Sequence, residues 1–328
     1  MTAHSGTAQP GPAQAPILTV TLNPALDIAT ATDSVVPEIK LRCDAPQVDP
    51  GGGGINVSRA IDRMGGRSTA LVALGGGTGV RLATQLAEAG LAVLRLEAPG
   101  DTRFSLSVTD RGTGQQFRFV LPGPQWGPLD VRAALDALGT SAPTGGLVVL
   151  SGSNPPGVPP AFAAMAAARL AGTGSRLVVD TSGAALAAVA AARDAPVELL
   201  RMDDAEAAFL AGAPLPTRAD TADFAARLAA SGAARTVIVA RGSDGNIIAT
   251  PEGRWHVAAH RVPVVSKVGA GDSFVAGYVL GLARHWSVAD ALGLGAAAAS
   301  ATVMTPASDL CHPADVERLF AEREVTPV

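Results

Sequence analysis

The stretch SKVGAGDSF (Ser266–Phe274) places a carboxylate directly after small residues, at the expected start of a helix. Gly269, Ala270 and Gly271 leave their backbone N–H groups accessible, and the positive end of a helix dipole favours a phosphoryl group there. Asp272 stands where a general base takes a proton from an attacking hydroxyl. The same carboxylate is equally suited to capping the helix, so this stretch alone leaves both roles open.

Two other glycine runs invite the same question. PGGGGINVSRA (50–60) runs into a predicted helix, where the glycines serve a close approach of backbone to ligand, a hinge, or both. LGGGTGVRLA (74–83) lacks the spacing of a dinucleotide fingerprint and is interpreted as a plain strand-to-helix turn. No Walker A motif occurs in the sequence, which argues against a P-loop enzyme.

Composition excludes several classes of protein. The 328 residues are 48% apolar and 16% charged, enough for a sizeable core and one large or two ordinary domains. A net charge of −4 gives no electrostatic footprint for nucleic acid or an anionic membrane surface. No apolar run has the roughly 18 residues of a membrane-spanning helix.

The cysteines and the first residues bear on the compartment. Cys43 and Cys311 form neither a disulfide framework nor a metal-ligand spacing, so we expect a reduced, cytoplasmic protein. Residues 1–16 are small, polar and proline-rich without the features of a secretion signal, and are predicted to be a disordered tail. The folded domain is expected to span 17–328.

Lysine usage is a further clue. Of 25 basic residues only Lys40 and Lys267 are lysines. A compact ammonium retained in an arginine-rich chain suggests a tight site. Chance survival on the surface is the better explanation for one lysine, but it explains two in glycine- or phosphate-like contexts less well.

Short apolar runs alternate with alanine- and leucine-rich runs along the chain. The former lack the alternation of half-buried strands, as expected of strands buried on both faces. We therefore predict an α/β sandwich with a mostly parallel central sheet and helices on both sides. The expected strands are 17–23, 68–76, 146–152, 176–180, 198–202 and 235–242, and the expected helices are 55–64, 79–89, 159–171, 184–193, 204–211 and 218–230.

Two segments break this alternation. Residues within about 28–50 and 101–123 are rich in β-branched and turn residues, and the second reads as a hairpin around DRGTG. We expect them to form a small β-sheet lid that projects from the core. After residue 270 the chain is predicted to be nearly all helical, with closely packed small residues.

Taken together, these motifs resemble the PfkB family of ribokinase-like sugar kinases. PGGGGINVSRAIDRMGG and VGAGDSFVAGYVLGL resemble its two signatures. TLNPALD, PEIKLRCDAP, GDTRFSL, RFVLPGP, SGSNPPG, VVDTSGAAL and SDLCHPAD follow, in order, the pattern of the minor bacterial ATP-dependent 6-phosphofructokinase subgroup. The resemblance covers about 17–325 and implies a ribokinase-like fold.

The resemblance also implies a role for individual residues. Asp272 matches the catalytic base, and Gly269, Ala270 and Gly271 match the anion hole for the γ-phosphoryl group. The residues implied to bind the phosphosugar are Asp27, Gly52, Gly53, Asn56, Arg103, Arg118 and Ser153, with Lys40 and Arg42 reaching phosphates across a homodimer clasped by the lids. ATP would contact Lys267, Asp203, Arg241, Gly242 and Gly245, and Glu206 would organise Mg²⁺ through water.

The nucleotide half departs from the family pattern. RMDDAE (201–206) stands where the family has Lys-Pro-Asn-x-x-Glu, so Asp203 replaces an asparagine. ARGSDG (240–245) lacks a hydroxyl at Ala240, and Lys267 replaces a threonine. Our hypothesis is that Lys267, together with Arg241, offsets the charge of Asp203 and supplies the missing phosphate contact.

The expected activity is ATP- and Mg²⁺-dependent phosphorylation of the C1 hydroxyl of fructose 6-phosphate. The alternatives are a 1-phosphofructokinase, a tagatose-6-phosphate kinase or, outside the enzymes, a catalytically weak phosphosugar-binding protein.

Overall fold

A ten-stranded sheet forms the centre of the protein in the computed structural model, which describes residues 14–193, 197–306 and 309–328. Its order is β14-β13-β12-β11-β10-β9-β8-β1-β4-β5, parallel from β11 to β5 and antiparallel from β11 to β14. The strands are β1 (Ile17–Thr21), β4 (Thr69–Leu74), β5 (Ala92–Glu97), β8 (Leu147–Ser151), β9 (Arg176–Asp180), β10 (Val197–Asp203), β11 (Ala234–Ala240), β12 (Asn246–Thr250), β13 (Gly253–Val257) and β14 (Val325–Pro327).

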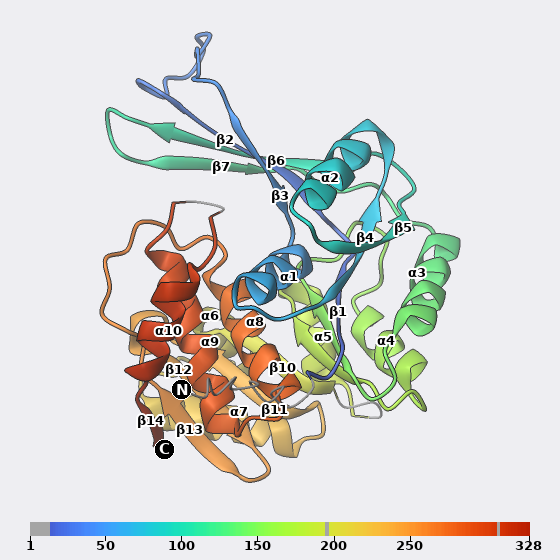
Figure 1. Ribbon diagram of the computed structural model, residues 1–328, viewed down its shortest axis with the longest axis vertical. Helices are drawn as coiled ribbons and strands as arrows, with labels where there is room; N and C mark the ends of the chain where they lie inside the picture. Colours follow the sequence, from blue (N-terminus) through green and yellow to red (C-terminus); the bar gives the residue numbers. More distant parts are fainter. Residues whose placement is uncertain (1–13, 194–196, 307–308) are drawn as a thin grey trace, which may run out of the picture.

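Helices cover both faces of this sheet (Figure 1). One face carries α3 (Pro128–Ser141), α4 (Phe162–Leu170), α5 (Gly183–Ala191), α6 (Asp204–Ala211) and α7 (Arg218–Ala230). The other carries α1 (Gly53–Arg63), α8 (Ala270–Ala283), α9 (Val288–Val303) and α10 (Pro313–Ala321), while α2 (Gly76–Glu88) packs beside β4. All residues of β1 and β8 are buried, as expected of strands covered on both sides.

A second sheet of four strands extends away from the core (Figure 1). Its order is β3 (Gln47–Gly51), β2 (Ala25–Thr32), β6 (Arg103–Asp110) and β7 (Gln116–Val120), with β6 and β7 joined by the predicted hairpin. Because side chains alternate along a strand, Asp27, Ser105 and Arg118 lie on one face and apolar side chains on the other. The predicted lid is thus present as a separate small sheet.

The parallel strands deliver polar residues to one edge of the large sheet. Ser151 ends β8, Asp180 ends β9 and Asp203 ends β10, and register pairs Ser151 with Asp180 and Asp203 with Ala240. Ligand sites of open α/β sheets lie at this carboxyl edge. The loop before α8 brings Asp272 to the same region.

The predicted fold class is confirmed, with a few elements missed. The sequence analysis did not predict α3, although Pro128 at its first turn and Asp130 bonded to the Gly127 N–H are good helix-start signals. It also missed β5, the exposed edge strand of the sheet. Residues 74–83 do form a plain turn, in which a Cβ on Gly75 would meet the Gly100 carbonyl oxygen at 1.9 Å.

The chain start differs partly from expectation. Most of the tail predicted to be disordered, residues 1–13, lies outside the described residues. Gln14 exchanges two hydrogen bonds with the Arg67 backbone and the Ala15 N–H donates to the Ala283 carbonyl, so the last residues of that segment are ordered. Cys43 and Cys311 are both free. Within the described ranges, no helix is both long and apolar enough to cross a membrane.

Candidate active site

Asp272 lies in the first turn of α8, beside the amide groups of the preceding small residues. Gly269 is the N-cap of this helix and has φ 75°, which brings the chain into the helix through the left-handed region. The Asp272 side chain does not cap the helix. Its Oδ2 accepts a hydrogen bond from Asn56 Nδ2 at 2.9 Å, across from α1. Of the two roles that the sequence left open for Asp272, capping of α8 is therefore not observed.

The surroundings of Asp272 favour a proton acceptor that works near neutral pH. Burial, reinforced by the negative charge of Asp180, raises the pKa of Asp272 to about 7. The hydrogen bond from Asn56 and the charge of Arg201 act in the opposite direction. A carboxyl with a pKa near the working pH exchanges protons most effectively, because it is ionised in use yet a stronger base than an ordinary aspartate.

Asp180 and Arg201 form an ion pair beside this carboxylate. Arg201 Nη1 lies 3.3 Å from Asp180 Oδ1, and their side chains are only 17% and 12% exposed. A Cβ on Gly271 would lie 3.2 Å from Arg201 Nη2, so the guanidinium packs against the backbone of the predicted anion hole. The Arg201 Nε is buried without a hydrogen-bond partner. The pair therefore places a cation, and its balancing carboxylate, at the start of α8.

A cavity of about 860 Å³ opens at the same point. Its charged lining side chains are Arg201, Arg261 and Lys267, and no aspartate or glutamate lines it within the described part of the chain. The remaining wall is largely apolar, with Val262, Val264, Phe274, Ala296, Ala299 and Val303. Three cationic side chains together with apolar side chains over much of the wall suit a ligand that joins a polyanion to a flat apolar ring.

Most residues predicted to bind the nucleotide line this cavity. Ala270 and Gly271 lie at its α8 end, and Gly242, Gly245 and Lys267 on its other walls. Lys267 is exposed, so its ammonium is available to an incoming anion.

Two residues predicted to contact ATP have other roles in the structure. Asp203 Oδ1 caps α6 by accepting from the Glu206 N–H at 2.8 Å, and Glu206 Oε2 accepts in return from the Asp203 N–H at 2.9 Å. Arg241 donates to the segment before α7 and does not line the cavity. Four hydrogen bonds from its Nε, Nη1 and Nη2 direct the Arg241 side chain away from the cavity, so the predicted phosphate contact would require some of these bonds to be released.

The predicted sugar-side residues gather where the small sheet meets the core. Arg103 Nε and Nη2 both donate to the Asn23 carbonyl, at 3.3 and 3.2 Å. Burial raises the pKa of Asp27, against the opposing charges of Arg103 and Arg118. A Cβ on Gly51 would lie 2.2 Å from Asp27 Oδ2, so only glycine leaves room for this carboxylate. The charge of Asp27 also acts on Asp272, which places the two halves of the site within electrostatic reach.

The glycine run and Ser153 complete this side. Gly52 is the N-cap of α1 and Gly53 its first residue, where a Cβ would lie 2.3 Å from Ser151 Oγ. Ser153 Oγ accepts from Asn23 Nδ2 at 3.1 Å, while Asn23 Oδ1 is buried without a partner. The run thus ends β3 and lets α1 approach the carboxyl edge of the sheet.

Lys40 and Arg42 are not brought to this site within one chain. Both are exposed on the loop between β2 and β3, at the end of the small sheet farthest from the core (Figure 1).

Glu206 is the candidate for organising a metal. Burial, strengthened by the neighbouring charge of Asp203, raises its pKa, and Arg201 opposes the shift. Among the described residues, no three histidine, cysteine, aspartate or glutamate side chains cluster closely enough to hold an ion by themselves. One carboxylate near an anion cavity fits Mg²⁺, which keeps several waters and takes further ligands from substrate phosphates.

Sequence reasoning missed four residues of this site. Asp180 ends an expected strand at the carboxyl edge, which was the available signal for it. Arg201 stands where the resembling family has lysine, a cation for a cation. His260 and Arg261 line the cavity from a segment without secondary structure, and no pattern in the sequence marks them.

Comparison with known proteins gives a family and close relatives. The model of the pfkB family of carbohydrate kinases matches residues 21–315. The ATP-dependent 6-phosphofructokinase isozyme 2 of Mycobacterium tuberculosis is 40% identical over 93% of this chain and 88% of its own length. The enzyme of the same name from Escherichia coli K12 is 37% identical, over 93% of this chain and 98% of that protein.

A solved structure shows the same architecture. The crystal structure of phosphofructokinase-2 from Escherichia coli in complex with potassium superposes with a TM-score of 0.88 at 36% identity. The match covers 94% of this chain and 99% of that one.

Proposed function

Because the chain belongs to the pfkB family of carbohydrate kinases, we propose that this sugar kinase transfers the γ-phosphoryl group of ATP to the C1 hydroxyl of fructose 6-phosphate. The products are fructose 1,6-bisphosphate and ADP. The observation that carries the proposal is the position of Asp272, between the partly buried Asp27–Arg103 side and a cavity that, among the described residues, is lined by Arg201, Arg261 and Lys267 and by no carboxylate. The relatives named 6-phosphofructokinase support the choice of acceptor.

The chemistry follows from the groups around Asp272. Its carboxylate takes the proton of the C1 hydroxyl as that oxygen forms a bond to the γ-phosphorus, and the bond from phosphorus to the bridging oxygen breaks. The N–H groups at the start of α8, with Arg201 and Lys267, stabilise charge on the transferred group. Asn56 orients the carboxylate through its 2.9 Å hydrogen bond.

The two substrates occupy opposite sides of this carboxylate. Arg103 and Arg118 present guanidinium groups to the 6-phosphate, a geometry in which arginine forms paired charged hydrogen bonds. The apolar wall of the cavity holds the adenine ring, and Arg261 and Lys267 meet the phosphates. Glu206 would hold Mg²⁺ through water, and the bound ion would supply positive charge to offset that of the phosphates.

We further propose that the protein is a homodimer that associates through its small sheets. The face opposite Asp27 and Arg118 exposes Phe104 and Phe119, by 40% and 52%, and the exposed Leu121 follows directly after β7. Such a patch marks an interface. Sedimentation equilibrium tests the proposal, with Phe119→Asp expected to give monomers and a monomeric parent chain contradicting it.

A coupled assay of ADP release tests the function. Fructose 6-phosphate should give the highest kcat/KM, well above fructose 1-phosphate and tagatose 6-phosphate. Preference for fructose 1-phosphate would make the protein a 1-phosphofructokinase, and preference for tagatose 6-phosphate a kinase for that sugar. Measurable phosphosugar binding without turnover on any acceptor would instead identify a binding protein.

A further inference from the structure

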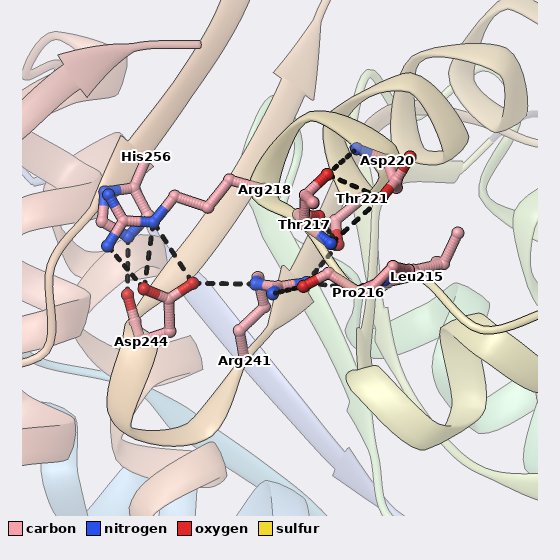
Figure 2. Close-up of polar contacts among 9 residues, drawn as sticks. All are labelled: Leu215, Pro216, Thr217, Arg218, Asp220, Thr221, Arg241, Asp244 and His256. Atoms are coloured by element: carbon pink, nitrogen blue, oxygen red, sulfur yellow. Dashed lines mark hydrogen bonds and ion pairs between the residues drawn. The ribbon is translucent and has the colours of Figure 1, made fainter.

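The loop that joins β11 to β12 has two functionally different sides. Gly242, Ser243 and Gly245 line the cavity proposed for the nucleotide, whereas Arg241 and Asp244 do not. Figure 2 shows these two side chains directed toward each other and toward the segment around α7. The loop therefore offers backbone and small side chains to the cavity and charged side chains to the structure behind it.

Arg241 fastens the loop to the segment that leads into α7. Its Nη1 donates to the Leu215 carbonyl at 3.0 Å and to Thr221 Oγ1, and its Nη2 donates to the Pro216 carbonyl at 3.1 Å (Figure 2). The Nε donates to Asp244 Oδ2 at 2.9 Å. With only 13% of the side chain exposed, these bonds are largely shielded from water.

Asp244 is held from two further directions. Arg218, in the first turn of α7, pairs with its carboxylate through Nε at 2.9 Å and through Nη2. The Asp244 backbone carbonyl accepts from the Nε2 of the buried His256 on β13, at 2.6 Å. Hydrogen bonds from Arg218 and Arg241 lower the pKa of Asp244 to about 2, so its carboxylate is charged throughout the physiological range.

The 242–245 loop needs such anchors because its two glycines allow its backbone many conformations. Gly242 has φ 56° and Gly245 has φ 101°, and glycines visit many conformations at little cost. A Cβ on Gly245 would lie 2.0 Å from the Val257 carbonyl oxygen, so this glycine cannot be exchanged for a stiffer residue. Ordering a loose loop around a ligand lowers affinity, and fixing it beforehand restores affinity.

We propose that Arg241 and Asp244 are positioning residues that preorganise the 242–245 loop for the phosphoryl donor. They act through the loop and without touching the substrate. This inference rests on the proposed function in assigning the cavity to a nucleotide. The hydrogen bonds of Arg241 and Asp244 are expected to affect the binding of the phosphoryl donor. They should affect neither the binding of the sugar nor the proton transfer at Asp272.

Asp244→Asn in the full chain is the main test, because it removes the charge that both arginines hold while keeping the size of the side chain. The KM for ATP should rise about 10-fold, with the KM for fructose 6-phosphate unchanged within about twofold and kcat within about threefold. Arg218→Gln should raise the ATP KM less, about threefold, because Arg241 still holds Asp244. The Arg218 side chain is half exposed, so this second variant tests the idea even if Asp244→Asn folds poorly.

The matched control is Asp223→Asn, which breaks the ion pair between Asp223 on α7 and Arg254 on β13. This pair also joins α7 to the β12–β13 hairpin, but it does not contact the 242–245 loop. The ATP KM should therefore stay at the parent value. A purely structural role for Asp244 would lower the thermal midpoint while leaving the ATP KM within twofold of the parent, which overturns the inference. An equal rise of the ATP KM in the control also overturns it.

Calorimetric titration with ADP, without sugar, separates this inference from the proposed function. A parent chain that binds ADP but phosphorylates none of the acceptors would contradict the proposed function alone. An ADP Kd raised about 10-fold by Asp244→Asn would then still support the positioning role. An unchanged Kd would overturn it.

Discussion

The acceptor side and the donor side of the site are built in different ways. Asp27 and Arg103 are partly buried, so that the pKa of Asp27 rises and that of Arg103 falls, and Gly51 must be a glycine because the Asp27 carboxylate approaches it directly. Around Lys267 and Arg261, the charged groups are exposed on the wall of a wide cavity. On the acceptor side, close packing therefore limits which residue types fit. On the donor side, binding depends on the net charge of the cavity wall and on the 242–245 loop, which Arg241 and Asp244 hold in place.

This difference explains where the sequence keeps to the pattern of its family and where it departs. A buried carboxylate against a glycine leaves no alternative residue type, because any side chain would collide. A solvated cation near a phosphate is replaceable by another cation a few ångströms away, since the attraction falls off slowly with distance. We therefore expect substitutions on the acceptor side to cost more than substitutions on the donor side.

The largest effect is expected where the two sides meet. Asp272→Asn removes the proton acceptor while preserving the shape of the side chain, so kcat should fall about 10³-fold. Binding of both substrates should change little, because the 860 Å³ cavity and the Arg103 side remain intact. Steady-state kinetics with calorimetric binding of each substrate checks this, and a fall of less than tenfold would show that another group takes the proton.

Arg103→Gln probes the acceptor side. Loss of a guanidinium paired with a phosphate removes charged hydrogen bonds of about 1.5–3 kcal/mol, so the KM for fructose 6-phosphate should rise about 10- to 100-fold. The ATP KM should stay within about twofold. Equal increases of both constants would mean that Arg103 supports the whole site by holding the Asn23 carbonyl.

The sequence pointed to the residues of the two sides in different ways. Asp272 follows small residues at an expected helix start, whereas Asp27, Asn56 and Arg103 were named through the ordered motifs that resemble the family, and their roles stay predictions. Asp180 and Arg201 meet only because register pairs their strands, which a sequence does not display. His260 and Arg261 reach the cavity from a segment without secondary structure, where no periodicity guides prediction.

The fold shows a similar division. Strands buried on both faces and their following helices were predictable from short, non-alternating apolar runs that alternate with alanine- and leucine-rich runs. The edge strand β5 was missed because its apolar run, Ala92–Leu94, is only three residues long and is followed by the charged Arg95 and Glu97. Arg241 and Asp203 were placed at the nucleotide by their position in the motif, but hydrogen bonds to α7 and the cap of α6 decide where their side chains point.

The pH dependence of kcat/KM tests the link between the two sides. Because the pKa of Asp272 is raised to about 7, the carboxyl is protonated below that pH and cannot accept a proton. Activity should therefore fall about tenfold per pH unit below 7 and level off above it. Removing the hydrogen bond that favours the ionised form, by Asn56→Ala, should move this limb to higher pH. A limb that stays fixed would belong to the phosphate of the substrate.

Lys267→Thr probes the donor side and restores the residue type of the resembling family. We expect the ATP KM to rise about fivefold at low salt and less at high salt, because an exposed cation is screened. Lys267→Arg keeps the charge and serves as the control, with an ATP KM close to that of the parent. If Lys267→Thr leaves both the ATP KM and kcat unchanged, the ammonium does not meet the phosphates.

Asp203→Asn should give the smallest change in the ATP KM, and it tests how tightly the donor side is constrained. Asparagine caps a helix as well as aspartate does, so α6 should form as before and the thermal midpoint should hardly move. The variant removes one negative charge from the neighbourhood of Glu206 and the proposed phosphate site. The ATP KM should therefore fall by about twofold, with no change on the acceptor side. A KM that rises several-fold instead would mean that the carboxylate of Asp203 binds the donor together with its metal, and that the donor side is as tightly constrained as the acceptor side.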